Sequence, residues 1–177
     1  MDPNLTTSLC THCGLCCDGS LFADVELVGP AEAKRLEIMG LEVEDTDAGL
    51  LSQPCAALRG RRCGIYEHRP KCCRTFECQL LQDVEAGAVP LERAKDQVAE
   101  ALRQIRRVRE LLAKLGQRAT RLPLKERCAE ALAGEASPIP EVNRQRAELK
   151  AEMAALEKML WQRFLGSGKQ RGSPDPR

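Results

Sequence analysis

The sequence predicts an α+β fold that is mostly α, in which a small irregular cysteine-cluster domain precedes an antiparallel helical hairpin. Nine of the ten cysteines lie between Cys10 and Cys78. The residues after them repeat apolar side chains at helical spacing, which indicates long amphipathic helices. The chain has only three Phe, one Tyr and one Trp. Because aromatic rings usually supply much of a core's buried area, the first half needs another source of stability.

Composition divides the chain into three regions. Residues 1–87 form the cysteine-cluster domain, which we expect to be metal-binding and stabilised by its metal. Residues 88–165 have helical composition and form the predicted hairpin. Residues 166–177 are rich in Gly, Pro and Ser, cannot bury a core and are predicted to be a disordered tail.

The use of the cysteines depends on the redox compartment. The first nine residues have neither the basic start nor the apolar run of a secretory signal. No apolar stretch approaches the roughly eighteen residues that span a membrane. We therefore expect a cytoplasmic protein without a membrane partner. Under reducing conditions, clustered thiols bind metal more often than they form disulfides, which are the alternative.

Within the first region, few segments have a regular pattern. A short strand is predicted near residues 22–28, and a helix over residues 30–39 that ends at Gly40. Pro70 is well placed to begin a helix over residues 71–85. The acid-rich residues 42–47 lack the spacing of a calcium loop and are predicted to form an exposed turn.

The second region predicts three helices. The first runs from Leu91 in a heptad pattern and ends at Gly116, and a short helix follows over residues 124–132. A second long helix begins near Glu141, and its apolar seam closes with Trp161 and Phe164. Two long amphipathic helices most simply form an antiparallel hairpin. We expect it to serve packing, to form a homodimer or to bind an unidentified protein partner.

Basic residues gather on and after the first long helix. They are Arg103, Arg106, Arg107, Arg109, Arg118 and Arg121. Such a stripe is typical of nucleic-acid binding, but no aromatic residues are interleaved for base stacking. Glutamates of the second long helix can pair with the stripe instead. We therefore do not expect nucleic-acid binding.

The first cysteine block places four thiols within eight residues. Cys10 and Cys13 form a C-x-x-C pair that can hold one ion from a tight turn, and Gly14 lets the backbone fold around it. Cys16 and Cys17 are adjacent, and adjacent side chains diverge. Such a pair is better suited to two metals, or to one metal and something else, than to holding one ion together.

The second block adds further thiols over residues 55–78. The candidate ligands of both blocks are Cys10, Cys13, Cys16, Cys17, Cys55, Cys63, Cys73 and Cys78. Eight thiolates suffice for two tetrahedral sites, or for one iron–sulfur cluster with thiols to spare. Thiolate ligands favour zinc or iron over magnesium or calcium, and the spacing alone does not choose between the two metals.

Charge supports the same site. A divalent ion with four thiolates has a formal charge of −2, and nearby cations offset it. We expect Arg69 and Arg74 to be the first such cations and to orient the ligands. His12 and His68 are weaker candidates, because enough thiolates are present without them. No catalytic constellation is evident, so the sequence leaves open whether the protein is an enzyme.

The two blocks together resemble the YkgJ-type cysteine-cluster family, described as a zinc- or iron-chelating domain. The resemblance covers roughly residues 10–82. The matching positions are Cys10, Cys13, Gly14, Cys16, Cys17, Pro54, Cys55, Leu58, Cys63, Ile65, Tyr66, Arg69, Pro70, Cys73, Arg74, Phe76 and Cys78. The resemblance implies metal chelation. Cys72 and Cys128 fall outside the pattern, and we expect a spare thiol and a small buried apolar residue respectively.

Three function classes follow. The preferred one is a binding module in which the metal is structural, since closed sites made wholly of cysteine are normally structural. The others are an iron- or redox-dependent enzyme and a metal storage or delivery protein. If the metal is structural, serine at Cys13 or Cys63 should collapse folding, whereas serine at Cys128 should cost little.

Overall fold

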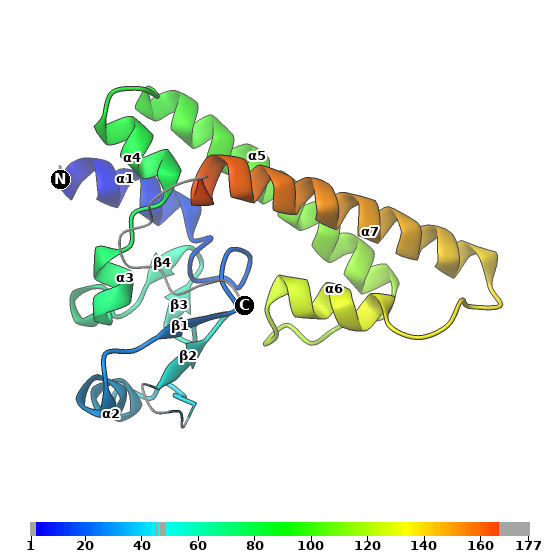
Figure 1. Cartoon of the computed structure of the whole chain (residues 1–177), viewed down its shortest axis with the longest axis horizontal. Helices are drawn as coiled ribbons and strands as arrows, with labels where there is room; N and C mark the ends of the chain where they lie inside the picture. Colours follow the sequence, from blue (N-terminus) through cyan, green and yellow to red (C-terminus); the bar gives the residue numbers. More distant parts are fainter. Residues whose placement is uncertain (1–2, 45, 47–48, 167–177) are drawn as a thin grey trace.

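A computed structural model of the chain describes residues 3–44, 46 and 49–166. A cysteine-rich half, built of short elements, lies at one end, and a helical arm extends away from it (Figure 1). The observed class is α+β and mostly α, as the sequence predicts. Most of the predicted disordered tail, residues 167–177, and part of the predicted acidic turn lie outside the described residues.

The cysteine-rich half contains short helices and two small sheets. Its elements are α1 (Pro3–Cys13), β1 (Asp24–Glu26), α2 (Pro30–Ile38), β2 (Leu50–Ser52), β3 (Leu58–Arg59), β4 (Arg62–Cys63), the 3-10 turn η1 (Tyr66–His68), α3 (Lys71–Thr75) and α4 (Gln79–Glu85). Strand β1 pairs antiparallel with β2, and β3 with β4. Each sheet has two strands, so neither can form a core by itself.

Two sequence predictions about this half need correction. The helix predicted over residues 71–85 is two helices, because Phe76 is extended between α3 and α4, with φ −74° and ψ 125°. The first C-x-x-C pair lies on helix α1, whereas the sequence predicted a tight turn. Helix α2 does form as predicted and is followed by Gly40, whose φ of 83° ends the turn.

The helical arm consists of α5 (Leu91–Lys114), α6 (Leu124–Leu132), α7 (Pro140–Leu160) and the π-helical turn η2 (Trp161–Leu165). Helices α5 and α7 run in opposite directions. Glu100 pairs with Arg163 at 2.5 Å, and Arg107 pairs with Glu148. The second of these pairs joins the basic stripe to a glutamate of α7, as the sequence allowed.

Two separate groups of buried side chains hold the fold together. The larger one joins α1 and α4 to α5, α6, α7 and η2 through residues such as Leu15, Leu81, Leu112, Leu156 and Phe164. The smaller one, in the sheet region, consists of Leu27, Leu36, Leu41, Leu51 and Ala57. The arm is therefore packed onto the first half by a continuous core, while the sheet region has little apolar burial of its own.

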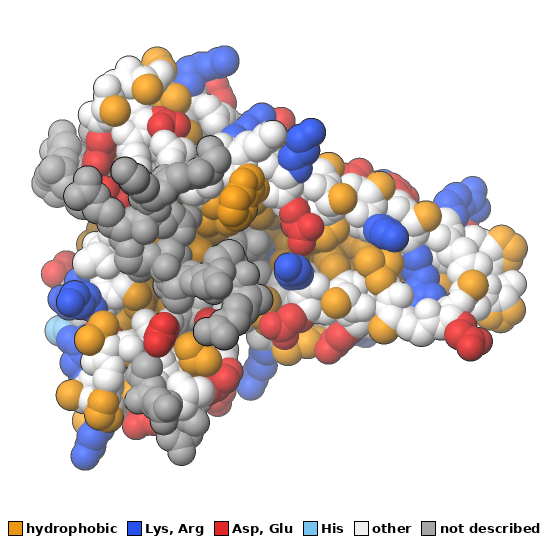
Figure 2. Space-filling model, viewed as in Figure 1, with side chains coloured by type: hydrophobic (Ala, Val, Ile, Leu, Met, Phe, Trp, Pro, Cys, Tyr) orange, Lys and Arg blue, Asp and Glu red, His pale blue; other side chains and the backbone are white. Residues whose placement is uncertain are grey.

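The face of the arm seen in Figure 2 carries charges of both signs. Figure 2 shows Lys and Arg side chains interspersed with Asp and Glu along it, and hydrophobic side chains between α6 and α7. Among the described residues, no helix has the length and apolar composition needed to cross a membrane.

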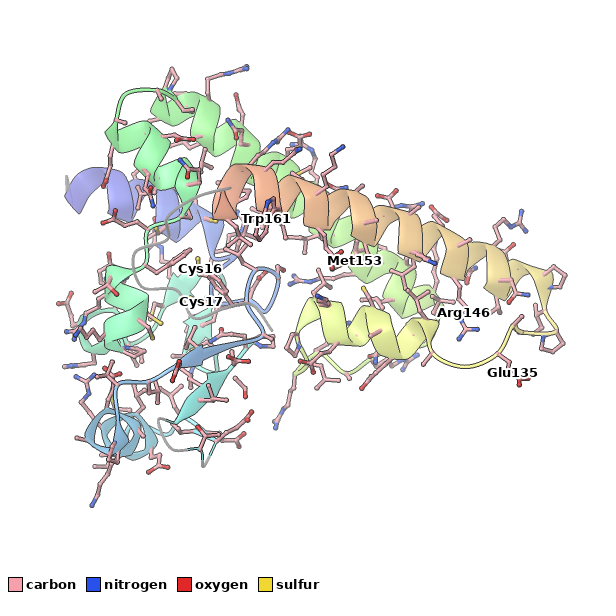
Figure 3. All side chains as sticks on the ribbon, in the orientation of Figure 1. Cys16, Cys17, Glu135, Arg146, Met153 and Trp161 are labelled. Carbon is pink, nitrogen blue, oxygen red and sulfur yellow. The ribbon has the colours of Figure 1, made fainter. Side chains whose placement is uncertain are left out.

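Arg146 of α7 fixes the end of α6. Its Nε donates to the carbonyl of Ala131 at 3.1 Å, and its terminal nitrogens donate to those of Glu135, at 2.8 Å, and Ala133. Figure 3 shows the side chain reaching from α7 toward the segment that contains Glu135. The last carbonyls of a helix have no partner within it, so a cation there both neutralises and binds them.

Replacing Arg146 by methionine is expected to lower the free energy of unfolding by about 2 kcal/mol, because several carbonyls lose a charged donor. The matched control is Arg144→Met, which removes an exposed arginine paired with Glu141 on the same helix. That change should cost less than about 0.5 kcal/mol. Urea unfolding of both variants measures the difference. Equal stabilities would contradict the capping role.

Candidate metal centre

The first cysteine block lies at the end of α1. Cys10 and Cys13 occupy its last turn, three residues apart and therefore on one face. Gly14 then turns the chain with φ of 74°. A Cβ at this glycine would lie 3.3 Å from the Cα of Arg61, so the β3–β4 turn packs directly on the backbone here. Any larger residue would push the two cysteine blocks apart.

Cys16 and Cys17 follow in the next turn, where α1 meets the strands (Figure 3). The backbone joins the two blocks at this point, because the N–H of Cys55 donates to the carbonyl of Cys17 at 2.8 Å. Cys63 lies on β4. The structure therefore brings Cys55, from the second cysteine block, next to Cys17 of the first.

Four thiols next to α1 influence one another. Burial raises the pKa of Cys13, and its neighbours Cys78 and Cys10 raise that pKa further. Burial likewise raises the pKa of Cys16 well above its ordinary value, with Cys13 and Cys78 the next contributors. We call Cys10, Cys13, Cys16 and Cys78 the helix group. Cys78 immediately precedes α4, which packs beside α1.

The other four candidate thiols gather around the strands. Burial raises the pKa of Cys17 to about 12, with Cys55 and Cys63 the next contributors and Cys10 a lesser one. The Cys73 thiol, on α3, is raised in pKa by its hydrogen bond with Cys72, by burial and by nearby thiols that include Cys17 and Cys55. We call Cys17, Cys55, Cys63 and Cys73 the strand group.

The thiols are close but are not arranged around an ion. Among the described residues, no three Cys, His, Asp or Glu side chains form a ready-made metal site. Burial raises the pKa of Cys13, Cys16 and Cys17, and neutral thiols do not coordinate metal. Metal binding therefore has to remove protons and turn side chains toward a common point. The donors fit zinc or iron, because each group offers four sulfur atoms.

Arg69 lies between the two groups. Its guanidinium donates to the carbonyl of Cys73 at 3.5 Å and stacks over the ring of Tyr66, 3.7 Å from its centroid. Burial raises the pKa of Cys10, and the positive charge of Arg69 partly lowers it again. This position fits the predicted role of a cation that neutralises bound thiolates.

The second predicted cation has no comparable contact. Arg74 is exposed, and none of the hydrogen bonds or ion pairs of the described residues involves its side chain. Arg59 is better placed, because it lowers the pKa of Cys55 against the dominant effect of burial. From the sequence alone, Arg59 could equally be a cation near the cluster or a residue of a solvated basic loop. A tight turn between β3 and β4 brings Arg59 near Cys55. Gly60 is the one residue in the sequence that indicates this turn.

The remaining candidates stay outside the two groups. His12 and His68 are exposed, and Nδ1 of His12 donates to the carbonyl of Ser8 at 2.6 Å. The sulfur of Cys72 lies 3.9 Å from that of Cys73. Cys128 is buried in the larger core with 3% of its surface exposed, as predicted for a small apolar residue.

Comparison with protein families gives one match. Residues 9–106 match the model of the CxxCxxCC family, described as "Putative zinc- or iron-chelating domain". Comparisons with curated proteins and with solved structures give no match. The matched region contains all eight candidate cysteines and continues into α5, beyond the boundary at residue 87 that composition suggested. Because the match covers more than half of the chain and confirms the resemblance in its cysteine pattern, the protein belongs to the CxxCxxCC family of metal-chelating domains.

Proposed function

We propose that the helix group and the strand group each bind one zinc or iron ion, and that these ions are structural in a module that binds a protein partner through its helical arm. The proposal is supported by the different neighbours of the adjacent pair: among the other thiols, Cys16 is influenced most by Cys13 and Cys78, whereas the carbonyl of Cys17 accepts a hydrogen bond from the N–H of Cys55. The adjacent Cys16 and Cys17 belong to different groups. Diverging side chains of neighbouring residues can reach two ions, which is what two tetrahedral sites require.

The structural role follows from the small amount of apolar burial around the strands. The fully buried core of the sheet region consists of five residues, one of which is alanine, and a further five partly buried apolar residues pack against it. Segments this short do not fold stably by hydrophobic burial alone and commonly depend on metals or disulfides. An ion bound by Cys17, Cys55, Cys63 and Cys73 would tie together four separate segments of this region. Its binding free energy would then contribute directly to folding.

The exposure of Cys10 supports a second candidate function. Cys10 has more of its surface exposed than the other seven candidate thiols, although the protein around its sulfur still raises its pKa by burial. An ion in the helix group would therefore be reachable by solvent or by another protein's thiols. This arrangement favours metal delivery over an iron- or redox-dependent enzyme, because exchange needs an accessible ligand.

Metal analysis of anaerobically purified protein tests the proposal. We expect two ions per chain, and a chelator should unfold the sheet region while most of the helical signal of the arm remains. A colourless protein identifies zinc, and visible charge-transfer absorbance identifies iron. Two ions that resist exchange support the structural role, and one readily exchanged ion supports delivery. A reduced, fully folded protein without metal would refute both.

A further inference from the structure

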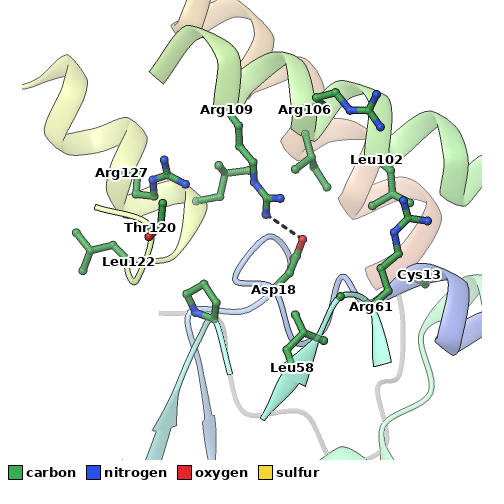
Figure 4. Close-up of a pocket in the computed structure, with 15 residues that line it drawn as sticks. Cys13, Asp18, Leu58, Arg61, Leu102, Arg106, Arg109, Thr120, Leu122 and Arg127 are labelled. Carbon is green, nitrogen blue, oxygen red and sulfur yellow. Dashed lines mark hydrogen bonds and ion pairs between the residues drawn. The ribbon is translucent and has the colours of Figure 1, made fainter. Parts of the chain in front are cut away.

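A cavity of about 430 Å³ lies between the cysteine-rich half and the arm. Figure 4 shows side chains from α5, from the segment leading into α6 and from the turn after Cys17 pointing into the same space. Its size is within the range of pockets that bind small molecules. The two cysteine groups do not account for it, because Cys13 is the only one of their eight members among its lining residues.

Four arginines line this cavity, and a single carboxylate among the lining residues partly offsets their positive charge. Arg61, Arg106, Arg109 and Arg127 line it, and Asp18 is the one carboxylate among the lining residues. That carboxylate is already paired with Arg109 at 2.9 Å. The lining thus has three more positive charges than negative ones. The cavity is therefore a favourable place for an anion.

Arg127 is the strongest evidence that a ligand belongs here. Only 8% of its surface is exposed, and its Nε atom is buried without a hydrogen-bond partner. No carboxylate of the described residues forms an ion pair with it. Burial and the charge of Arg109 both lower its pKa. A buried, unpaired guanidinium is destabilising, so its presence at a cavity calls for a negatively charged partner.

The rest of the wall is apolar. Leu58, Leu102, Ile105 and Leu122 line the same cavity. Leu122 lies near Arg127, while Leu58 and Leu102 lie on the opposite side (Figure 4). A ligand that fits both parts has an anionic group for the arginines and an apolar body for the leucines. Inorganic anions alone would leave the apolar wall unused.

We propose that this cavity binds a small organic anion, with a phosphate or carboxylate group held by Arg127, Arg106 and Arg109. The observation that carries the proposal is a buried, unpartnered arginine at a positively charged cavity. The proposal does not rest on metal binding by the two cysteine groups. It makes the junction between the cysteine-rich half and the arm a ligand site.

Calorimetric titration of the metal-loaded protein tests it with phenyl phosphate, benzoate, inorganic phosphate and benzyl alcohol. We expect one or both aromatic anions to bind, with inorganic phosphate weaker and the neutral alcohol not binding. Binding by only one aromatic anion identifies the anionic group that the site prefers. Failure of both at millimolar concentration, or equal affinity for phenyl phosphate and inorganic phosphate, would overturn the proposal.

Variants separate binding from folding. Arg127→Met should weaken anion binding about tenfold or more, because a charged hydrogen-bonding partner is lost. The same change should raise the melting temperature of the ligand-free protein, since a buried unpaired charge is removed. Arg144→Met, remote from the cavity, should change neither property. Arg106→Gln, at an exposed position, provides a second test of binding. Unchanged affinity in both cavity variants would contradict the site.

Discussion

Serine in place of Cys13 or of Cys63 is expected to remove one metal ion from the protein and to unfold the segments that this ion holds. The two changes affect different sites. Cys13→Ser should empty the helix group and leave the ion of the strand group, and Cys63→Ser should do the reverse. Apparent binding free energies of structural zinc are about 10–16 kcal/mol, comparable to the whole stability of a small domain. The loss of a ligand should therefore be severe.

Metal content per chain and limited proteolysis measure these effects. Cys72→Ser is the matched control, because Cys72 is partly buried beside Cys73 but belongs to neither group. It should retain both ions. Loss of both ions in each single variant would show that the thiols form one shared cluster. Retention of both ions in the Cys13 variant would contradict the assignment of the helix group.

The structure changes the expectation for Cys128. From the sequence, serine at this position was expected to cost little. The side chain is buried in the larger core, where a serine hydroxyl needs a partner. A buried hydroxyl without one costs about 1–3 kcal/mol. Cys128→Ala is therefore the milder way to remove this thiol.

Alanine in place of Phe164 is expected to lower the free energy of unfolding by about 3–5 kcal/mol, the usual cost of removing a buried aromatic ring. Phe164 lies in η2, has 1% of its surface exposed and belongs to the core that joins the arm to α1 and α4. Its loss should therefore loosen the attachment of the arm's end to the cysteine-rich half. Denaturant unfolding and hydrogen exchange in α4 measure the two effects.

Trp161→Ala is the matched aromatic control. Trp161 begins the same turn but is 51% exposed, although the sequence had placed it in the apolar seam. Its replacement should cost less than about 1 kcal/mol, since little apolar area is lost from the interior. If both variants lose equal stability, η2 is not oriented as described.

The helices with local signals were predictable from sequence. Helix α6 has the predicted bounds, and α5 ends just before Gly116, whose φ of 80° suits a glycine. Apolar periodicity identified α5 because one side of this helix faces a continuous core. Residues close together in the chain determine such helices, so a single sequence is enough to predict them.

The errors arise where distant residues meet. The break at Phe76 has no local breaker, but its ring packs edge-to-face on Phe22, with centroids 5.1 Å apart. Phe76 makes this tertiary contact from its extended conformation, and sequence periodicity gives no sign of either. The break also separates Cys73 from Cys78, which then join different groups. The candidate thiols could be named from their spacing, whereas their division into two groups depends on tertiary packing.

Gly19, two residues after Cys17, connects the turn of the adjacent cysteines to the helical arm. The carbonyl of Gly19 accepts a hydrogen bond from the N–H of Leu124, the first residue of α6, at 2.8 Å. A Cβ at Gly19 would lie 3.2 Å from the Cα of Pro123, so the two segments are in direct backbone contact. Whatever displaces this turn also moves the first residue of α6. A protein that recognises α6 would thus distinguish the metal-bound form from the metal-free form without contacting any cysteine.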